Sequence, residues 1–88
     1  MADIYSAEGD KLGTIGISPQ EMDLLKAGVT TMIRFHTPRM LQGMLGMQRG
    51  WFELSIRDGR IVASDIAAVK RYLALQHAIV EAGKLSDA

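Results

Sequence analysis

Apolar and polar residues alternate between Trp51 and Ala63 in a pattern typical of two short β-strands. Residues 51–56 place an apolar side chain at every second position, and residues 61–63 resume an apolar run after a break. The break contains Asp58 and Gly59, a pair that supplies the positive φ angles of a tight hairpin turn. The sequence therefore predicts a β-hairpin over residues 51–63.

A long helix is predicted directly after this hairpin, over residues 65–82. Ser64 and Asp65 are candidate N-caps, and Gly83 is placed to end the helix. Its apolar residues cover about half of the helix circumference, more than the ~100° stripe that a surface helix needs for a single core. Gln76 lies inside this apolar arc, so either it bonds a backbone carbonyl in the core or that part of the helix faces a partner.

The N-terminal segments are predicted to form a second hairpin around a turn at residues 8–11. Gly13 and Gly16 weaken its second arm, because glycine loses the most entropy on ordering. A helix then begins clearly. Ser18 as N-cap, Pro19 at the first helical position and Glu21 reaching back form a capping box.

The end of this helix has two interpretations. Gly28 suggests that the helix ends there, and the β-branched residues of 29–35 then favour a strand. The competing interpretation continues the helix to His36, since apolar residues recur at helical spacing. We slightly favour the helix, because one glycine costs a helix only ~1 kcal/mol.

A further helix is predicted from Arg39 to about Gln48, with Thr37 as its N-cap. Its distinctive feature is a methionine stripe made of Met40, Met44 and Met47. Methionine both fills irregular core gaps and lines adaptable binding surfaces, so both roles stay open. Together these elements predict a small α+β fold, with residues 1–88 as a single domain.

Charge is unevenly distributed in a chain whose formal net charge is zero. Residues 1–23 carry five acids and one lysine, whereas residues 24–52 carry no acid and four basic residues. The basic middle is suited to an acidic partner, or to the acidic start of the chain within an oligomer. The chain has no cysteine, no leader-like segment and no run of 18 apolar residues, so we expect a cytoplasmic protein without disulfides or a membrane span.

Candidate catalytic groups are few. His36 lies at a helix boundary, and His77 forms an ordinary i,i+4 pair with Glu81. No serine stands in a nucleophile-elbow pattern and no glycine-rich phosphate loop is present. We therefore expect a protein that is not an enzyme and has no catalytic, metal or cofactor site.

Residues 24–35 resemble the turn of helix-turn-helix DNA-binding proteins, in which a helix ends in a sequence such as Ala-Gly-Val-Thr and a second helix follows. The resemblance implies that Thr30, Thr31 and Arg34 face the major groove, with Lys26 and Arg39 near phosphates. That family places an aliphatic residue six positions after the turn glycine, where this chain has Arg34.

The order of elements in the C-terminal half is similar to that of the small head-tail joining proteins of tailed phages. The likeness comprises a helix, a hairpin with an Asp-Gly turn, and a helix that opens with Ser64 and Asp65 and carries Lys70, Arg71 and Tyr72. It is a likeness of topology.

The sequence favours a non-catalytic interaction or assembly subunit that forms a homo-oligomer or docks on a larger protein. Its expected contact residues are Met40, Met44, Met47, Trp51 and Gln76. The alternative is a small helix-turn-helix-like DNA-binding regulator that uses Lys26, Thr30, Thr31, Arg34 and Arg39.

Overall fold

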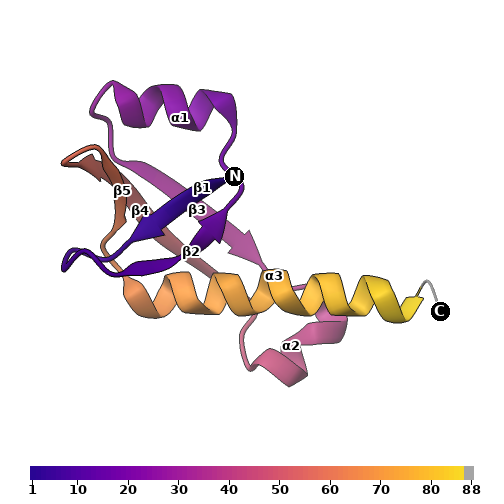
Figure 1. The fold of residues 1–88 in the computed structure, drawn as a ribbon. Coiled ribbons are helices and arrows are strands. Elements are labelled where there is room, and N and C mark those ends of the chain that lie inside the picture. The colour runs from indigo at the N-terminus through magenta and orange to yellow at the C-terminus, as the bar shows by residue number, and fades with distance from the viewer. Residues whose placement is uncertain (87–88) are drawn as a thin grey trace.

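The computed structural model describes residues 1–86 and shows a small α+β domain, as predicted (Figure 1). Its elements are β1 (Ala2–Tyr5), β2 (Lys11–Ile15), α1 (Pro19–Lys26), β3 (Thr31–His36), α2 (Arg39–Leu45), β4 (Arg49–Arg57), β5 (Arg60–Ala63) and α3 (Ile66–Ser86).

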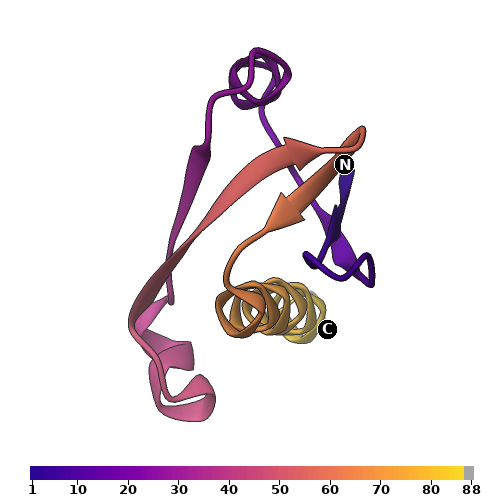
Figure 2. The same cartoon turned by 90° about the vertical axis from the view of Figure 1, so that its left-hand side faces the viewer.

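The five strands form one sheet in the order β2-β1-β5-β4-β3. Only the β1–β5 pair is parallel, and the other neighbours are antiparallel. Figure 2, which looks nearly along α3, shows the sheet curving around this helix, with β3 and β4 on one side and β1 and β2 on the other. The sheet and α3 therefore enclose the core between them.

The core is built from one face of each strand and one side of α3. Phe52 and Leu54 of β4 and Val69 of α3 are fully buried. Phe35, Phe52 and Tyr72 pack ring against ring, with centroids 5.3 to 6.3 Å apart. Helix α1 connects the two edge strands, β2 and β3, at one end of the sheet. Its Leu25 side chain is buried in the same core.

Both predicted hairpins are confirmed. Asp58 and Gly59 form the turn between β4 and β5 with φ angles of 52° and 76°, as the turn chemistry requires. The strand before this turn begins at Arg49, two residues earlier than predicted. In the N-terminal hairpin, the Ser6 amide donates to the Asp10 carbonyl across the loop at 2.8 Å.

The capping box of α1 is also confirmed. The Glu21 amide donates to Ser18 Oγ at 3.2 Å, and the Ser18 amide donates to Glu21 Oε1 at 3.0 Å. The helix ends at Lys26, and Gly28 has a φ of 86°. Our slight preference for a helix continuing to His36 is therefore wrong.

A strand forms at Thr31–His36 because a partner surface is available for it. Alternate residues of β3 are buried, and its inner residues lie opposite Phe52 and Leu54 of β4. Pairing with β4 satisfies the backbone groups on one side of β3 and buries Ile33 at the same time. The helical spacing of the apolar residues therefore did not decide the structure.

The other two helices differ from prediction at their ends. In α2 the N-cap is Pro38 rather than Thr37, and the buried Thr37 hydroxyl has no hydrogen-bond partner in the described residues. This helix stops at Leu45 because Gly46 adopts a left-handed conformation with φ 67°. By contrast, α3 continues through Gly83 to Ser86.

The start of α3 agrees with the sequence. The Ala68 amide donates to Asp65 Oδ1 at 3.0 Å, as expected for an N-cap aspartate. Within the described residues, no helix combines the length and the apolar character needed to cross a membrane.

Candidate protein-interaction surface

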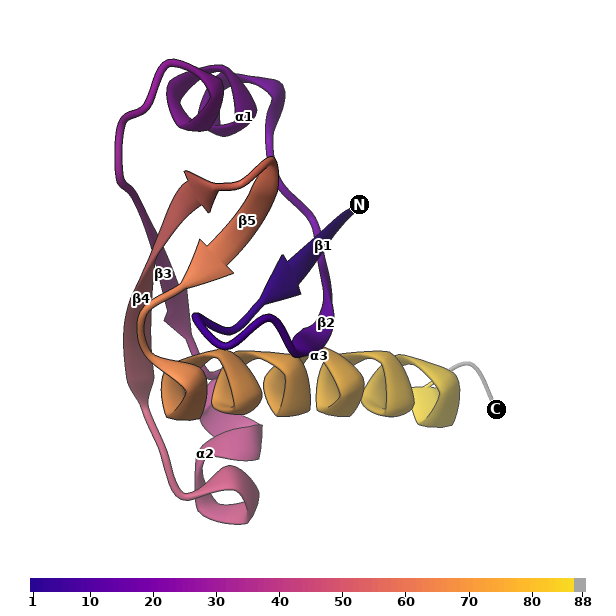
Figure 3. The same ribbon diagram turned by 60° about the vertical axis from the view of Figure 1, so that its left-hand side comes forward.

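A two-stranded arm projects from the sheet and carries the exposed methionines. The arm consists of β3, the first half of β4 and α2, which connects them. Figures 2 and 3 show α2 at the end of this arm, away from α1. The arm exists because β4 has nine residues and β5 only four, so β4 continues past the end of its neighbour.

The predicted methionine stripe is divided by the packing of α2. Met40 and Met44 are 82% and 70% exposed, whereas Met47 is half-buried against the core. Leu41 is the buried residue of α2, and Leu45 also packs against the core. Two of the three methionines thus lie on the surface at the tip of the arm.

Trp51 is the large exposed aromatic residue of the arm, with 56% of its surface accessible. It lies on the outer face of β4, directly opposite Arg34 of β3 in the strand register. Arg34 in turn points its Nε at the Met32 sulfur, 3.3 Å away. Apolar and basic side chains therefore share this face.

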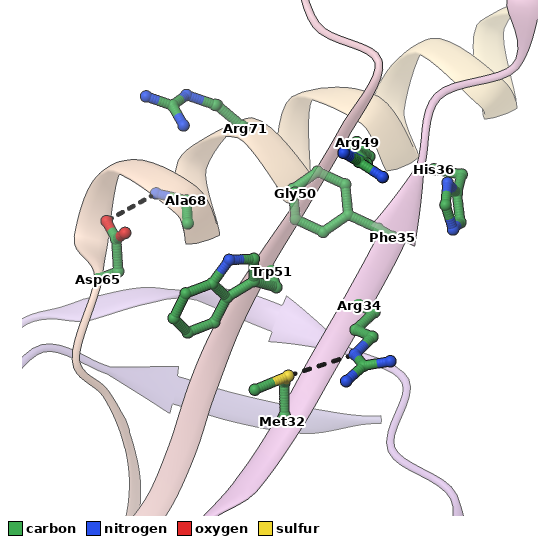
Figure 4. Close-up of a pocket in the computed structure, with 10 residues that line it drawn as sticks. All are labelled: Met32, Arg34, Phe35, His36, Arg49, Gly50, Trp51, Asp65, Ala68 and Arg71. Atoms are coloured by element: carbon green, nitrogen blue, oxygen red, sulfur yellow. Dashed lines mark hydrogen bonds between the residues drawn. The ribbon is translucent and has the colours of Figure 1, made fainter.

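An open groove of about 740 Å³ lies between the first residues of β4 and the first turns of α3 (Figure 4). Trp51 lies at the groove, near Asp65 and Ala68 of α3. Gly50 forms part of its floor, where the ring of Phe35 crosses the glycine. The groove therefore combines exposed backbone, an aromatic ring and a helix terminus.

Basic groups dominate the charge at the groove. Arg34, Arg49 and Arg71 line it, and they form no ion pair with any residue in the described part of the chain. One carboxylate, that of Asp65, faces them, and it already accepts the Ala68 amide. The helix-turn-helix resemblance predicts Arg34 as a DNA contact, and the sequence does not identify Arg49 or Arg71 as site residues. The available signal for Arg49 was the absence of acids from residues 24–52, and no signal in the sequence pointed to Arg71.

Gln76 belongs to α3, whereas the other residues predicted to act with it belong to the arm. It is exposed on α3 and is not buried in the core. Ile79 and Val80, further along this helix, are also exposed. The C-terminal turns of α3 extend beyond the sheet in Figures 1 and 3, so the apolar arc is wider than the core can cover there.

The residues of the helix-turn-helix comparison do not share a recognition helix. Thr31 is buried in β3, and Arg34 lies on the outer face of the same strand. Lys26 ends α1 and Arg39 begins α2, so β3 separates them. The second helix that the comparison requires is a strand, which corrects that prediction.

The carboxyl group of Asp3, which lies outside the groove, has a lowered pKa. Thr14 Oγ1 donates to Asp3 Oδ1 at 3.0 Å, and Lys11 Nζ lies 3.4 Å from the same oxygen. The hydrogen bond from Thr14, followed by the contact with Lys11, lowers the pKa of the Asp3 carboxyl. Among the residues that the structure describes, no three His, Cys, Asp or Glu side chains gather in a group able to hold a metal ion.

Comparison of the chain with protein-family models, with curated proteins and with solved structures finds no match. Function must therefore be inferred from the residues and their arrangement.

Proposed function

We propose that this protein is a non-catalytic interaction or assembly subunit that uses the projecting arm to contact another protein. The observation that carries the proposal is the exposure of Met40, Met44 and Trp51 on one projecting structure. Methionine and tryptophan are enriched at the centres of protein interfaces, where they supply apolar contact area.

The position of these residues supports the same proposal. Leu41 and Met47 already anchor α2 to the core, so Met40 and Met44 are not needed to hold the arm in place. Flexible methionine side chains can adapt to the shape of a partner. Either a second copy or a larger protein can satisfy this surface.

The test introduces two negative charges into the exposed patch, with Met40→Glu and Met44→Glu combined in one variant. Light scattering of the full chain at low and high salt measures self-association. Retention of a purified partner, or of proteins from the source cell, measures docking on other proteins. The control is Leu24→Glu with Val29→Glu, which makes the same charge change at two exposed apolar residues in and after α1, at the opposite end of the molecule from α2.

A defined oligomer that only the Met40 and Met44 variant dissociates would support the proposal. So would a partner that the control variant retains and the patch variant loses. A monomeric chain whose binding profile is unchanged by the patch variant would contradict it. Apolar contacts predict little salt dependence, whereas nucleic-acid binding would weaken steeply with salt.

A further inference from the structure

One edge of β4 is left open by the early end of β5. The β4–β5 ladder ends at the Leu54–Ala63 pair, and the Ser64 amide then contacts the Glu53 carbonyl at 3.4 Å. The β3–β4 ladder, in contrast, continues to the His36–Arg49 pair. Within the described chain, residues 49–52 of β4 therefore have a strand on one side only.

The register identifies which backbone groups face the open side. Successive residues of an antiparallel strand direct their N–H and C=O groups to opposite sides. The Gln48 carbonyl accepts the Thr37 amide of the β3 side, whereas the Glu53 carbonyl faces Ser64 on the β5 side. Because every second residue faces the same side, the backbone groups of Trp51 and Arg49 face the β5 side, as those of Glu53 do. That side is open at these two residues. Such groups are a template for an added strand.

The space beside this edge is large enough for an extended chain. The groove of about 740 Å³ lies between the edge and the first turns of α3. An added strand would run ~4.8 Å from β4, in the position that β5 vacates. Trp51 of β4 offers apolar contact to the side chains on one face of such a strand.

The charge at the groove specifies the chemistry of the occupant. Arg34, Arg49 and Arg71 have no acidic partner in the described chain, and Asp65 is engaged at the N-terminus of α3. The acidic start of a second copy fits less well, because its strand carboxylate at Asp3 already binds Thr14 and Lys11. A nucleic acid would satisfy the arginines, but it offers no peptide groups to pair with the edge.

We propose that the open edge of β4, at Arg49 and Trp51, binds an extended acidic segment of a partner protein, which joins the sheet as an additional strand. This inference rests on the proposed interaction function and specifies the class of partner. Main-chain hydrogen bonds supply part of the affinity, and the three arginines select acidic side chains.

The experiment titrates the full chain with the capped peptide acetyl-Glu-Val-Glu-Val-Glu-Val-amide. Trp51 is the only tryptophan of the chain, so its fluorescence reports on the groove directly. Two further peptides have the same sequence with N-methyl groups on alternate amides. In one the methyl groups are on the glutamate amides, and in the other they are on the valine amides. A fourth peptide replaces every glutamate with lysine. We expect saturable binding of the acidic peptide and binding weaker by about tenfold or more for the lysine peptide.

N-methylation separates strand addition from simple charge attraction. We expect one N-methylated register to bind about tenfold or more weakly, because it lacks the donors that face β4, and the other register to bind normally. The Arg49→Glu and Arg71→Glu double variant should weaken binding similarly. Arg57→Glu combined with Arg60→Glu is the control, since it makes the same total charge change at the β4–β5 turn, away from the groove.

Three results would overturn the inference. One is the absence of saturable binding of the acidic peptide up to about 1 mM. Another is equal binding of both N-methylated registers. The third is slow hydrogen exchange of the Arg49 and Trp51 amides in the free protein, as slow as that of Phe52, which would show that the edge is already covered. The Met40 and Met44 variants test a different surface, so this inference can fail while the proposed function stands.

Discussion

Substitution of Gly50 by alanine is expected to destabilise the fold, because the ring of Phe35 occupies the space that a side chain would need. A Cβ atom at Gly50 would overlap Phe35 Cζ and lie 2.9 Å from each of its Cε atoms. The ring has little freedom to move away, since it packs against Phe52 and Tyr72. Alanine therefore forces a rearrangement of the aromatic core.

The size of this effect follows from two opposing terms. Overpacking of a well-packed core costs ~1–3 kcal/mol. Replacing glycine by alanine restricts the unfolded chain and returns ~0.4–1 kcal/mol. We expect a net loss of about 1–2 kcal/mol, which lowers the Tm of a domain of this size by roughly 4–8 °C per kcal/mol.

Urea unfolding followed by far-ultraviolet circular dichroism measures the change, because a fluorescence signal from Trp51 would itself be altered by a substitution next to it. The control is Gly16→Ala, where no atom lies within 4 Å and φ is not positive. We expect this control to be neutral or up to ~1 kcal/mol stabilising.

A double-mutant cycle with Phe35→Leu tests the cause. Leucine lacks the Cε and Cζ atoms that would clash with alanine at position 50. In the Phe35→Leu background, Gly50→Ala should therefore cost less than about 0.5 kcal/mol. The reasoning is refuted if Gly50→Ala is as stable as the Gly16 control, or if its cost is unchanged in the leucine background.

Three further predictions concern local contacts. Ser18→Ala should destabilise the fold by ~1 kcal/mol in urea unfolding, because the Glu21 amide loses its acceptor; an unchanged midpoint would contradict this. Thr37→Val should be at least as stable as the wild type in the same assay, because the buried hydroxyl has no partner, and a clear loss of stability would show that it has one. In an NMR titration, Thr14→Val should raise the pKa of Asp3 towards its ordinary value. Since the folded-state pKa is lowered, the contribution of Asp3 to stability is present above its unfolded-state pKa and is lost as pH falls through the folded value.

The elements predicted well from the sequence depend on residues close together in the chain. The Asp58-Gly59 turn has the backbone angles that these residues favour, and the Ser18 capping box needs only its own helix. Such contacts do not depend on the rest of the fold, so local chemistry is sufficient to predict them.

The strand at Thr31–His36 could not be predicted in the same way. Its apolar residues fit both a strand and a helix, and the choice depends on the face that β4 presents across the sheet. The same limit applied to the methionine stripe. Which of Met40, Met44 and Met47 is buried depends on how Leu41 docks α2 on the core.

The sequence by itself determined the α+β class, both hairpins and the scarcity of catalytic groups, because composition, turn chemistry and capping act over a few residues. Only the tertiary structure decided that β4 continues past the end of β5. It also decided that Arg34, Arg49, Arg71 and Trp51 line the same groove. These residues come from three different elements. Their proximity depends on strand pairing and on the docking of α3, which involve residues far apart in the chain.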